Sequence, residues 1–286
     1  MPTVTDLVEI YLTDYLPRLR PNTQRSQTHC LEAVLAEFGP LELRALTPAM
    51  LADWRNRLRD TYGPGTVRLY LHALSSALRV AVCELYWLQD NPMARVSKPS
   101  PEPGRVRYLT DEERPRLLAE CQASHNPALY TIVLMALGTG MRKSEILTLR
   151  WEAIDLGAST IRLCQTKNGT ARGIPLPQVV REVLQQWWAQ RRLQTPWVFP
   201  DRRGEGPTEI GVAWDNARQR AGLPDFRFHD LRHTCASYLA MNGASLREIA
   251  EVLGHKSLAV TMRYSHLSTR HIAGVVNRMA IAFLSN

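Results

Sequence analysis

Hydrophobic and polar positions alternate at helical spacing through most of the first hundred residues. Apolar residues return every three or four positions in the stretches 4–16, 22–39, 47–63 and 65–87, a pattern that predicts amphipathic helices. Asn22 and Thr47 stand where N-caps are expected, Gly39 where the second helix should stop, and Pro48 at a first helical position. The first part of the chain is therefore predicted to be all helical, with four or five helices.

The helical pattern is interrupted after Asn91 by a proline-rich segment. NPMARVSKPSPEPG contains four prolines and a glycine within 14 residues, and such a segment cannot continue a helix or a central strand. We interpret residues 98–108 as a linker. It separates a helical domain, 1–97, from a larger domain, 109–286, and both lengths are ordinary for domains.

The second part changes its period after two predicted helices. STIRLCQT (159–166) and ARGIPL (171–176) are short strand-like runs, and KNGT between them contains Asn-Gly, a strong hairpin signal. This places Lys167 at the hairpin tip. Helical patterns return at about 177–193 and 208–221 and continue to the C-terminus, so the predicted fold class is mainly α with a small β-sheet (α+β).

Composition narrows the class of protein. The 286 residues are 45% hydrophobic, without an apolar run of membrane-spanning length or a signal peptide, so a cytoplasmic protein is expected. Five scattered cysteines without a CxxC pair indicate reduced thiols, not a disulfide framework or a metal site. The net charge is +8, of which residues 101–286 carry +7, and this surface should attract a polyanion.

The stretch HDLRHTC places His229 and Arg232 three residues apart, on one face of a predicted helix, while His233 is expected to point elsewhere. A guanidinium is a permanent cation and would repel a metal ion. The pair therefore suits an anion. Arg142 starts another predicted helix, where backbone N–H groups also favour an anion, although such an arginine is more often a surface residue.

Two further segments can contribute to the same site. His255 follows the helix-ending Gly254, and Tyr264 lies nine residues on, where the bland interpretation is a core tyrosine. The same region also resembles a helix-turn-helix. Arginines, histidines, the hairpin Lys167 and a tyrosine together suit phosphoryl transfer without a metal or cofactor: guanidiniums hold oxygens, imidazoles exchange protons and the tyrosine attacks.

In these segments the chain resembles the tyrosine recombinases, also called phage integrases. The strings that carry the resemblance are TGMRKSEILTLRW, TKNGTARGIPL, HDLRHTCASYLAMNGASLREIAEVLGH and TMRYSHL, in the family's order. The resemblance covers about residues 110–286, and the helical part before the linker looks like the family's core-binding, SAM-like domain. The compact two-domain layout is similar to that of the Xer recombinases, bacterial or phage-encoded.

The resemblance implies a role for each matching residue. Arg142 and Arg232 look like the arginines that clamp the scissile phosphate, and Lys167 like the lysine that protonates the leaving 5′ oxygen. Tyr264 looks like the nucleophile, which would form a 3′-phosphotyrosyl link.

The remaining matches are supporting. His229 matches the acid–base partner of the nucleophile, and His255 matches a residue that hydrogen-bonds the phosphate. Glu145 corresponds to an acidic residue that supports the pocket, with a helix-surface ion pair as the bland alternative.

The expected activity is therefore cleavage and rejoining of duplex DNA with strand exchange through a Holliday junction. The resemblance implies double-stranded DNA and a homotetramer on two recombination sites, with an accessory DNA-bending protein as a further partner and no membrane. The apolar stripe of HIAGVVNRMAIAFL suits docking on a neighbouring subunit or on its own domain. The rivals are a non-enzymatic helix-turn-helix regulator and a nicking-closing topoisomerase of the same chemistry.

Overall fold

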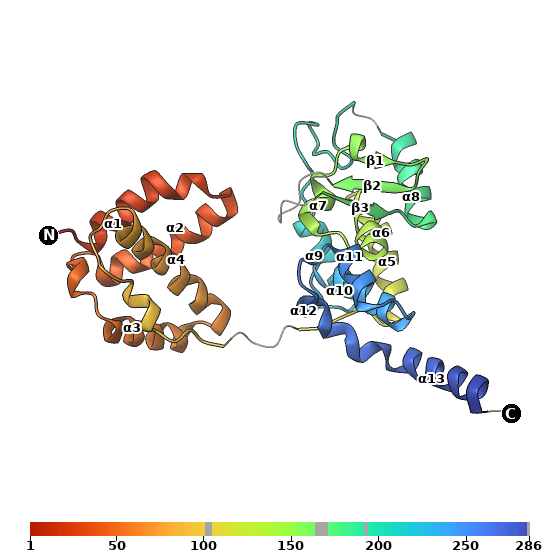
Figure 1. Cartoon of the computed structure of the whole chain (residues 1–286). Coiled ribbons are helices and arrows are strands. Elements are labelled where there is room, and N and C mark those ends of the chain that lie inside the picture. Colours follow the sequence, from red (N-terminus) through yellow and green to blue (C-terminus); the bar gives the residue numbers. More distant parts are fainter. Residues whose placement is uncertain (101–104, 164–170, 192–193, 285–286) are drawn as a thin grey trace. The chain divides into compact units, whose positions relative to one another are not determined.

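The computed structural model describes residues 1–100, 105–163, 171–191 and 194–284, and the chain forms two compact units, Met1–Gly104 and Arg105–Asn286 (Figure 1). Each unit has its own hydrophobic core. Within the described residues, no helix is both long and apolar enough to cross a bilayer.

The first unit is built from helices alone in its described part. The α-helices are α1 (Val4–Ile10), α2 (Pro21–Phe38), α3 (Pro48–Thr61) and α4 (Pro64–Cys83), joined by short 3₁₀ and π turns. Apolar residues of α4 are buried at helical spacing and pack on α2, as the sequence pattern predicts. Trp54 completes the core with an edge-to-face contact to Phe38, their ring centroids 5.5 Å apart.

The helix starts in this unit follow two different local rules. Thr47 accepts a hydrogen bond from the backbone N–H of Met50, with Pro48 at the first helical position, which confirms the predicted cap. The expected cap at Asn22 is wrong, because α2 already begins at Pro21. Proline fixes the helical φ without needing a hydrogen-bond partner, and therefore starts the helix two residues earlier, with Arg20 as the N-cap.

In its described residues, the second unit combines nine α-helices and two short 3₁₀ helices with one small sheet, drawn in Figure 1. The helices are α5 (Glu113–Gln122), α6 (Leu129–Thr139), α7 (Lys143–Leu147), α8 (Gln178–Ala189), α9 (Gly211–Arg220), α10 (Asp230–Met241), α11 (Leu246–Leu253), α12 (Leu258–Thr261) and α13 (Thr269–Leu284). The central pair is α6 against α10, both with mostly buried residues. The predicted class, mainly α with a small sheet, is confirmed.

The sheet is antiparallel with the order β1-β2-β3. Its strands are β1 (Ile154–Asp155), β2 (Thr160–Leu163) and β3 (Arg172–Pro175), and Ile161 pairs with Ile174, both fully buried. The two predicted strands are present, whereas β1 is too short to show a period in the sequence. The hairpin tip with Lys167 lies outside the described residues.

The helix-turn-helix interpretation meets an obstacle in this unit. Gly254 ends α11 with a left-handed φ of 65°, but α12 is only 4 residues long and continues into a 3₁₀ stretch, Met262–Ser268. A recognition helix has to lie along the major groove and present several side chains to the bases. One turn of α12 cannot do this.

Candidate active site

Arg142 is the N-cap residue of α7, and Glu145 lies in the first turn of this helix. The two residues are bound to each other. The backbone N–H of Arg142 donates to Glu145 Oε2 at 2.9 Å, and its Nη1 donates to Oε1 at 2.7 Å. The left-handed Gly140 ends α6 just before this turn, with φ at 62°, so the chain reverses into α7 within two residues. The sharp turn places Arg142 beside the C-terminal end of α6.

Glu145 also binds a residue that sequence reasoning missed. Nη2 of Arg172, on β3, donates to Glu145 Oε2 at 2.9 Å, and both side chains are about nine-tenths buried. The bland interpretation of Glu145 as a helix-surface ion pair is therefore wrong. A buried carboxylate between two guanidiniums fixes both of them, because charged hydrogen bonds away from water are strong. The signal for Arg172 in the sequence is its position shortly after the hairpin tip.

Arg232 occupies the most buried position of the three arginines, with 4% of its surface exposed. Its Nη1 donates to the carbonyl of Gly140 at 2.7 Å, and its Nη2 donates to the carbonyl of Leu253 at 2.6 Å. These two carbonyls belong to the ends of α6 and α11, where backbone acceptors lack partners within the helix. Arg232, on α10, therefore connects three helices.

The neighbouring arginines affect the protonation of Arg232. Burial, followed by the charges of Arg142 and Arg172, lowers the pKa of Arg232 to about 10. Burial is also the main reason why the pKa of Arg172 is lowered. At neutral pH Arg232 nevertheless stays cationic, so the site concentrates positive charge that an anion would neutralise.

The carbonyl of Leu253 receives Arg172 as well as Arg232, because Arg172 Nη1 also donates to it. The next residue, Gly254, leaves room for this. A Cβ at this position would collide with Arg172 Nη1. The left-handed backbone favours glycine at this position, and any side chain here would also force Arg172 to move.

His255 follows this turn, and its backbone N–H donates to the carbonyl of Ala250 at 2.9 Å, which fixes the residue against the end of α11. Its Nδ1 lies 2.9 Å from Thr261 Oγ1. Burial, and then the charges of Arg232 and Arg142, lower the pKa of His255 to about 4. The imidazole is therefore neutral at pH 7 and faces the arginine cluster.

Tyr264 is 1% exposed and lies in the 3₁₀ stretch after α12. Burial raises the pKa of its phenol, against the opposing charges of Arg263 and Arg232. Its hydroxyl lies 2.5 Å from Nδ1 of His233. The tyrosine therefore belongs to the same cluster as Arg232, with its hydroxyl facing a histidine.

The structure corrects the expectation for His233. The side chain was expected to point away from the face that carries His229, but the two rings are edge-to-face with centroids 5.1 Å apart. Residues four apart share a helix face as closely as residues three apart. His229 stands at the N-cap of α10, and burial lowers its pKa.

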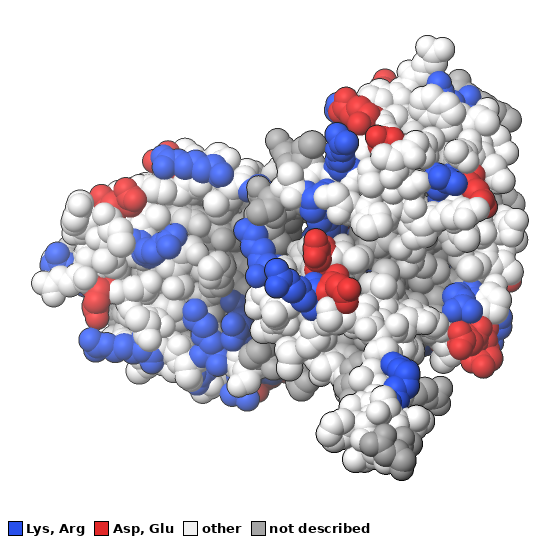
Figure 2. Space-filling view, turned by 45° about the vertical axis from the view of Figure 1, so that its right-hand side comes forward, with Lys and Arg blue, Asp and Glu red and all other residues white. Residues whose placement is uncertain are grey.

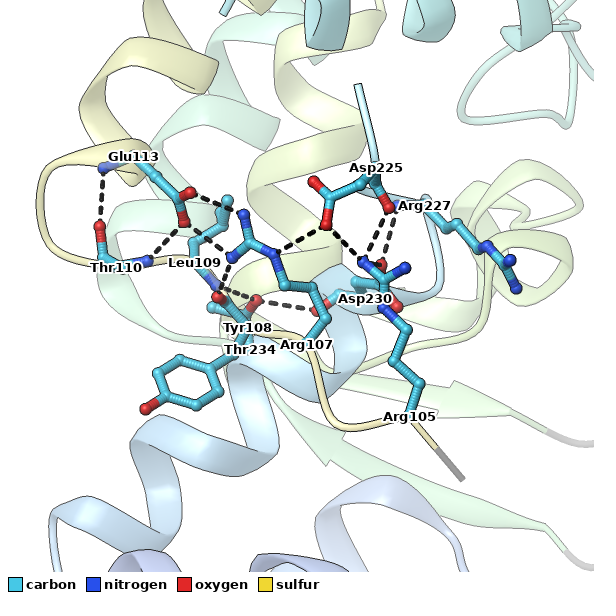
Figure 3. Close-up of polar contacts among 10 residues, drawn as sticks. All are labelled: Arg105, Arg107, Tyr108, Leu109, Thr110, Glu113, Asp225, Arg227, Asp230 and Thr234. Carbon is cyan, nitrogen blue, oxygen red and sulfur yellow. Dashed lines mark hydrogen bonds and ion pairs between the residues drawn. The ribbon is translucent and has the colours of Figure 1, made fainter. Parts of the chain in front are cut away.

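A polar network holds the start of α10 in place (Figure 3). Arg107 forms two hydrogen bonds with Glu113, at 2.6 and 2.8 Å, and its Nε lies 3.6 Å from Asp225. Thr234 Oγ1 accepts from the backbone N–H of Leu109 at 3.1 Å and donates to the carbonyl of Asp230 at 2.8 Å. The segment that enters the second unit is thereby fastened to the helix that carries His229 and Arg232.

Lys167 lies outside the described residues, so its predicted position at the site stays a prediction. Among the described residues, no group of three or more histidines, cysteines or acidic residues could hold a metal ion. Figure 2 shows lysine and arginine side chains distributed over the visible surface, with acidic side chains interspersed among them. The functional groups that the described site brings together are guanidiniums, imidazoles and a phenol.

Comparison with known proteins identifies the class. The phage integrase family matches residues 107–271, and the phage integrase N-terminal SAM-like domain matches residues 3–59. The chain belongs to the phage integrase family, whose members are tyrosine recombinases.

Its relatives include recombinases of bacteria and phages. The chain is 36% identical to the shufflon-specific DNA recombinase of Escherichia coli over 81% of its own length and 58% of that protein. It is 34% identical to the integrase of Salmonella phage P22, over 72% of its length and 55% of that protein. Tyrosine recombinase XerC of Staphylococcus carnosus is 29% identical, over 78% of this chain and 79% of that protein. The chain thus spans little more than half of the first two relatives.

Solved structures show the same fold. A lambda integrase dimer bound to a COC′ core site matches with a TM-score of 0.77 at 22% identity, over 92% of this chain and 95% of that one. The Tn1549 transposon integrase in complex with circular intermediate DNA matches with a TM-score of 0.75 at 19% identity, over 92% of this chain and 95% of that one. At these identities the likeness concerns the fold.

Proposed function

We propose that this protein is a site-specific DNA recombinase that cleaves and rejoins duplex DNA through a 3′-phosphotyrosyl intermediate. The observation that carries the proposal is the cluster around the buried guanidinium of Arg232. After burial, the charge of Arg142 is the main cause that lowers the pKa of Arg232, and the charge of Arg232 in turn opposes the burial that raises the pKa of Tyr264. Family membership supports the same activity. A non-enzymatic regulator would have no use for a buried tyrosine hydroxyl beside arginines.

The arginines supply most of the proposed catalysis. Arg142 and Arg232 bind the non-bridging oxygens of the scissile phosphate and stabilise the charge that develops during attack. Loss of one such donor typically costs roughly 100- to 1000-fold in rate. Because Glu145 and two backbone carbonyls already orient them, these guanidiniums need little reorganisation when DNA binds.

The chemical step exchanges one phosphoester for another. The phenol oxygen of Tyr264 bonds to phosphorus, the bond to the 5′ oxygen breaks, and Lys167 gives the leaving oxygen a proton. The phenol proton passes to a histidine, and the resemblance assigns the role of acid–base partner to His229. His255 hydrogen-bonds the phosphate. The number of phosphoester bonds is unchanged, so a second DNA end can reseal the strand without ATP, as in a type IB topoisomerase.

The two units suit a clamp on duplex DNA, in which residues 1–97 bind the core site and 109–286 catalyse. Strand exchange between two sites needs four active sites, and we infer a homotetramer on DNA. The last helix offers a contact for this, because α13 exposes apolar side chains: Val275, Val276, Met279, Ile281, Phe283 and Leu284. Docking on a neighbouring subunit would bury them.

The test is capture of a covalent adduct. The protein is incubated with sheared genomic DNA of its source organism and denatured, and the DNA that stays attached is sequenced. The parent and Tyr86→Phe should trap one recurring sequence, since Tyr86 is 83% exposed and outside the site. Tyr264→Phe should still bind DNA but trap none. An adduct in Tyr264→Phe, or none with the parent, would refute the proposal.

A further inference from the structure

The hydroxyl of Tyr264 lies against His233, a residue that the resemblance does not assign to catalysis. Tyr264 Oη and His233 Nδ1 are 2.5 Å apart, and the two rings are tilted, with centroids 5.9 Å apart. Both residues are buried, at 1% and 9% exposure. For His229, which the resemblance makes the partner of the nucleophile, the described contact is with the ring of His233.

We propose that His233 is a further catalytic residue, which accepts the hydroxyl proton of Tyr264 as the phenol attacks the phosphate. This inference rests on the proposed recombinase function and names the first proton acceptor within it. A contact between two buried polar atoms at this distance is a strong hydrogen bond.

The protonation states of the two partners fit this direction of transfer. Burial raises the pKa of Tyr264, so the phenol holds its proton until attack begins. Burial first, and then the charge of His229, lower the pKa of His233 to about 4. A neutral imidazole is the form that can accept a proton, and His233 keeps this form over the whole physiological range.

Binding of DNA strengthens the acceptor when it is needed. The groups that face His233 are His229, Asp230 and Arg232 of α10 and Arg263 of the 3₁₀ stretch, and the two arginines help to hold its pKa low. A phosphodiester carries one negative charge. Bound beside Arg232, it offsets these cations and thus favours the protonated imidazole.

The step balances within the residues named. The O–H bond of Tyr264 breaks and an N–H bond forms at His233 Nδ1, while the phenol oxygen bonds to phosphorus. The 5′ oxygen leaves with its electron pair and takes a proton from Lys167. In the rejoining step the phenol leaves phosphorus and recovers its proton from His233.

The experiment compares His233→Asn with the parent, using the full chain and a nicked duplex that carries the sequence recovered by adduct capture. Asparagine can still accept a hydrogen bond near the Nδ1 position but cannot take up a proton. His125→Asn is the control, because His125 is an exposed histidine of the same unit. The readout is the single-turnover rate of adduct formation from pH 6 to 9.5, and thermal unfolding checks each variant.

At pH 7 we expect His233→Asn to form the adduct roughly 100-fold or more slowly, the usual effect of losing a general base. Its rate should rise steeply with pH, because hydroxide has to remove the phenol proton, while the parent and His125→Asn stay flat. His233→Gln serves as the second variant if the asparagine variant fails to fold.

Three results would overturn the inference. A variant as fast as the parent would show that His233 takes no proton. A variant faster than the parent would show that the hydrogen bond to His233 only restrains Tyr264. A loss of rate that is equal at every pH would mark a structural role. Each leaves the recombinase proposal intact, since the parent still forms the adduct; a parent that forms none would refute that proposal and this inference with it.

Discussion

Arg232 shows how single residues determine the geometry of this site. Its guanidinium has five N–H donors, and two of its nitrogens are bound to the carbonyls of Gly140 and Leu253. A lysine could supply the charge but not this planar fork. The residue is therefore fixed in place before any substrate arrives, which is the condition for effective stabilisation of a transition state.

Two neutral histidines of the site make the second unit sensitive to acid. His233 and His255 have pKa values of about 4, whereas in the unfolded chain they titrate near 6.5. As the pH falls below 6.5 the unfolded chain takes up protons first, so the free energy of unfolding decreases until the folded values are reached near pH 4.

Between pH 7 and pH 5 we expect His255 to account for about 1 kcal/mol of lost stability, after allowance for its partial exposure. Thermal unfolding at the two pH values measures this. His255→Asn should lose less stability than the parent over this interval. Equal losses in the parent and the variant would contradict the assignment.

Sequence reasoning could name candidate site residues but not the residues that contact them. His229, Arg232 and Tyr264 stand in strings specific to the family, and these strings were readable without coordinates. The contacts of Arg172 and His233 depend on how β3 and the 3₁₀ stretch pack on α7 and α10. No spacing along the chain encodes such tertiary packing.

At the scale of elements, local chemistry made the helix ends predictable. Gly140 and Gly254 end α6 and α11 in the left-handed conformation, as glycine at a helix end predicts. The strand β1 escaped prediction, because it has only 2 residues. Its place is determined by the neighbouring strand and not by its own pattern. The stretch that contains α12 was expected to be helical, but α12 has only 4 residues and continues as a 3₁₀ helix.

The network at the start of α10 should contribute measurably to stability. Glu113 is mostly buried, and hydrogen bonding to Arg107 is the main cause of its lowered pKa. We expect Glu113→Gln to lower the free energy of unfolding by roughly 1–3 kcal/mol, the usual range for a buried charged partner.

Glu152→Gln is the matched control for this change. Glu152 is 75% exposed and its oxygen lies 3.8 Å from Arg150, so its loss should cost less than about 0.5 kcal/mol. Chemical unfolding of both variants at pH 7 measures the difference. Similar costs for the two would mean that the Arg107–Glu113 pair does not hold the segment.

At the scale of the whole molecule, the division into two units and the positive net charge suit an extended polyanion. The number of basic residues in the sequence overstates what is available for DNA. On α3, Arg57 is already bound to Asp53 and Glu37, whereas Arg59 is exposed and makes no ion pair within the described residues. Only the structure separates these two arginines.

We therefore expect Arg59→Gln to weaken binding of duplex DNA and to reduce the slope of log affinity against log salt by about 1. Arg57→Gln should change the slope less, because its charge is compensated within the helix bundle. Titrations of duplex DNA at salt concentrations from about 50 to about 200 mM measure both slopes. A larger effect of Arg57→Gln would show that its ion pairs open on DNA.

The bonds of Arg232 also carry a mechanical consequence. Its guanidinium is bound to the ends of both α6 and α11, so any sliding of one helix past the other would tilt the plane that we propose binds the phosphate. A neighbouring protomer that leans on α11 could therefore change the rate of cleavage without touching a reacting atom. Turnover would then report on the state of the assembly as a whole.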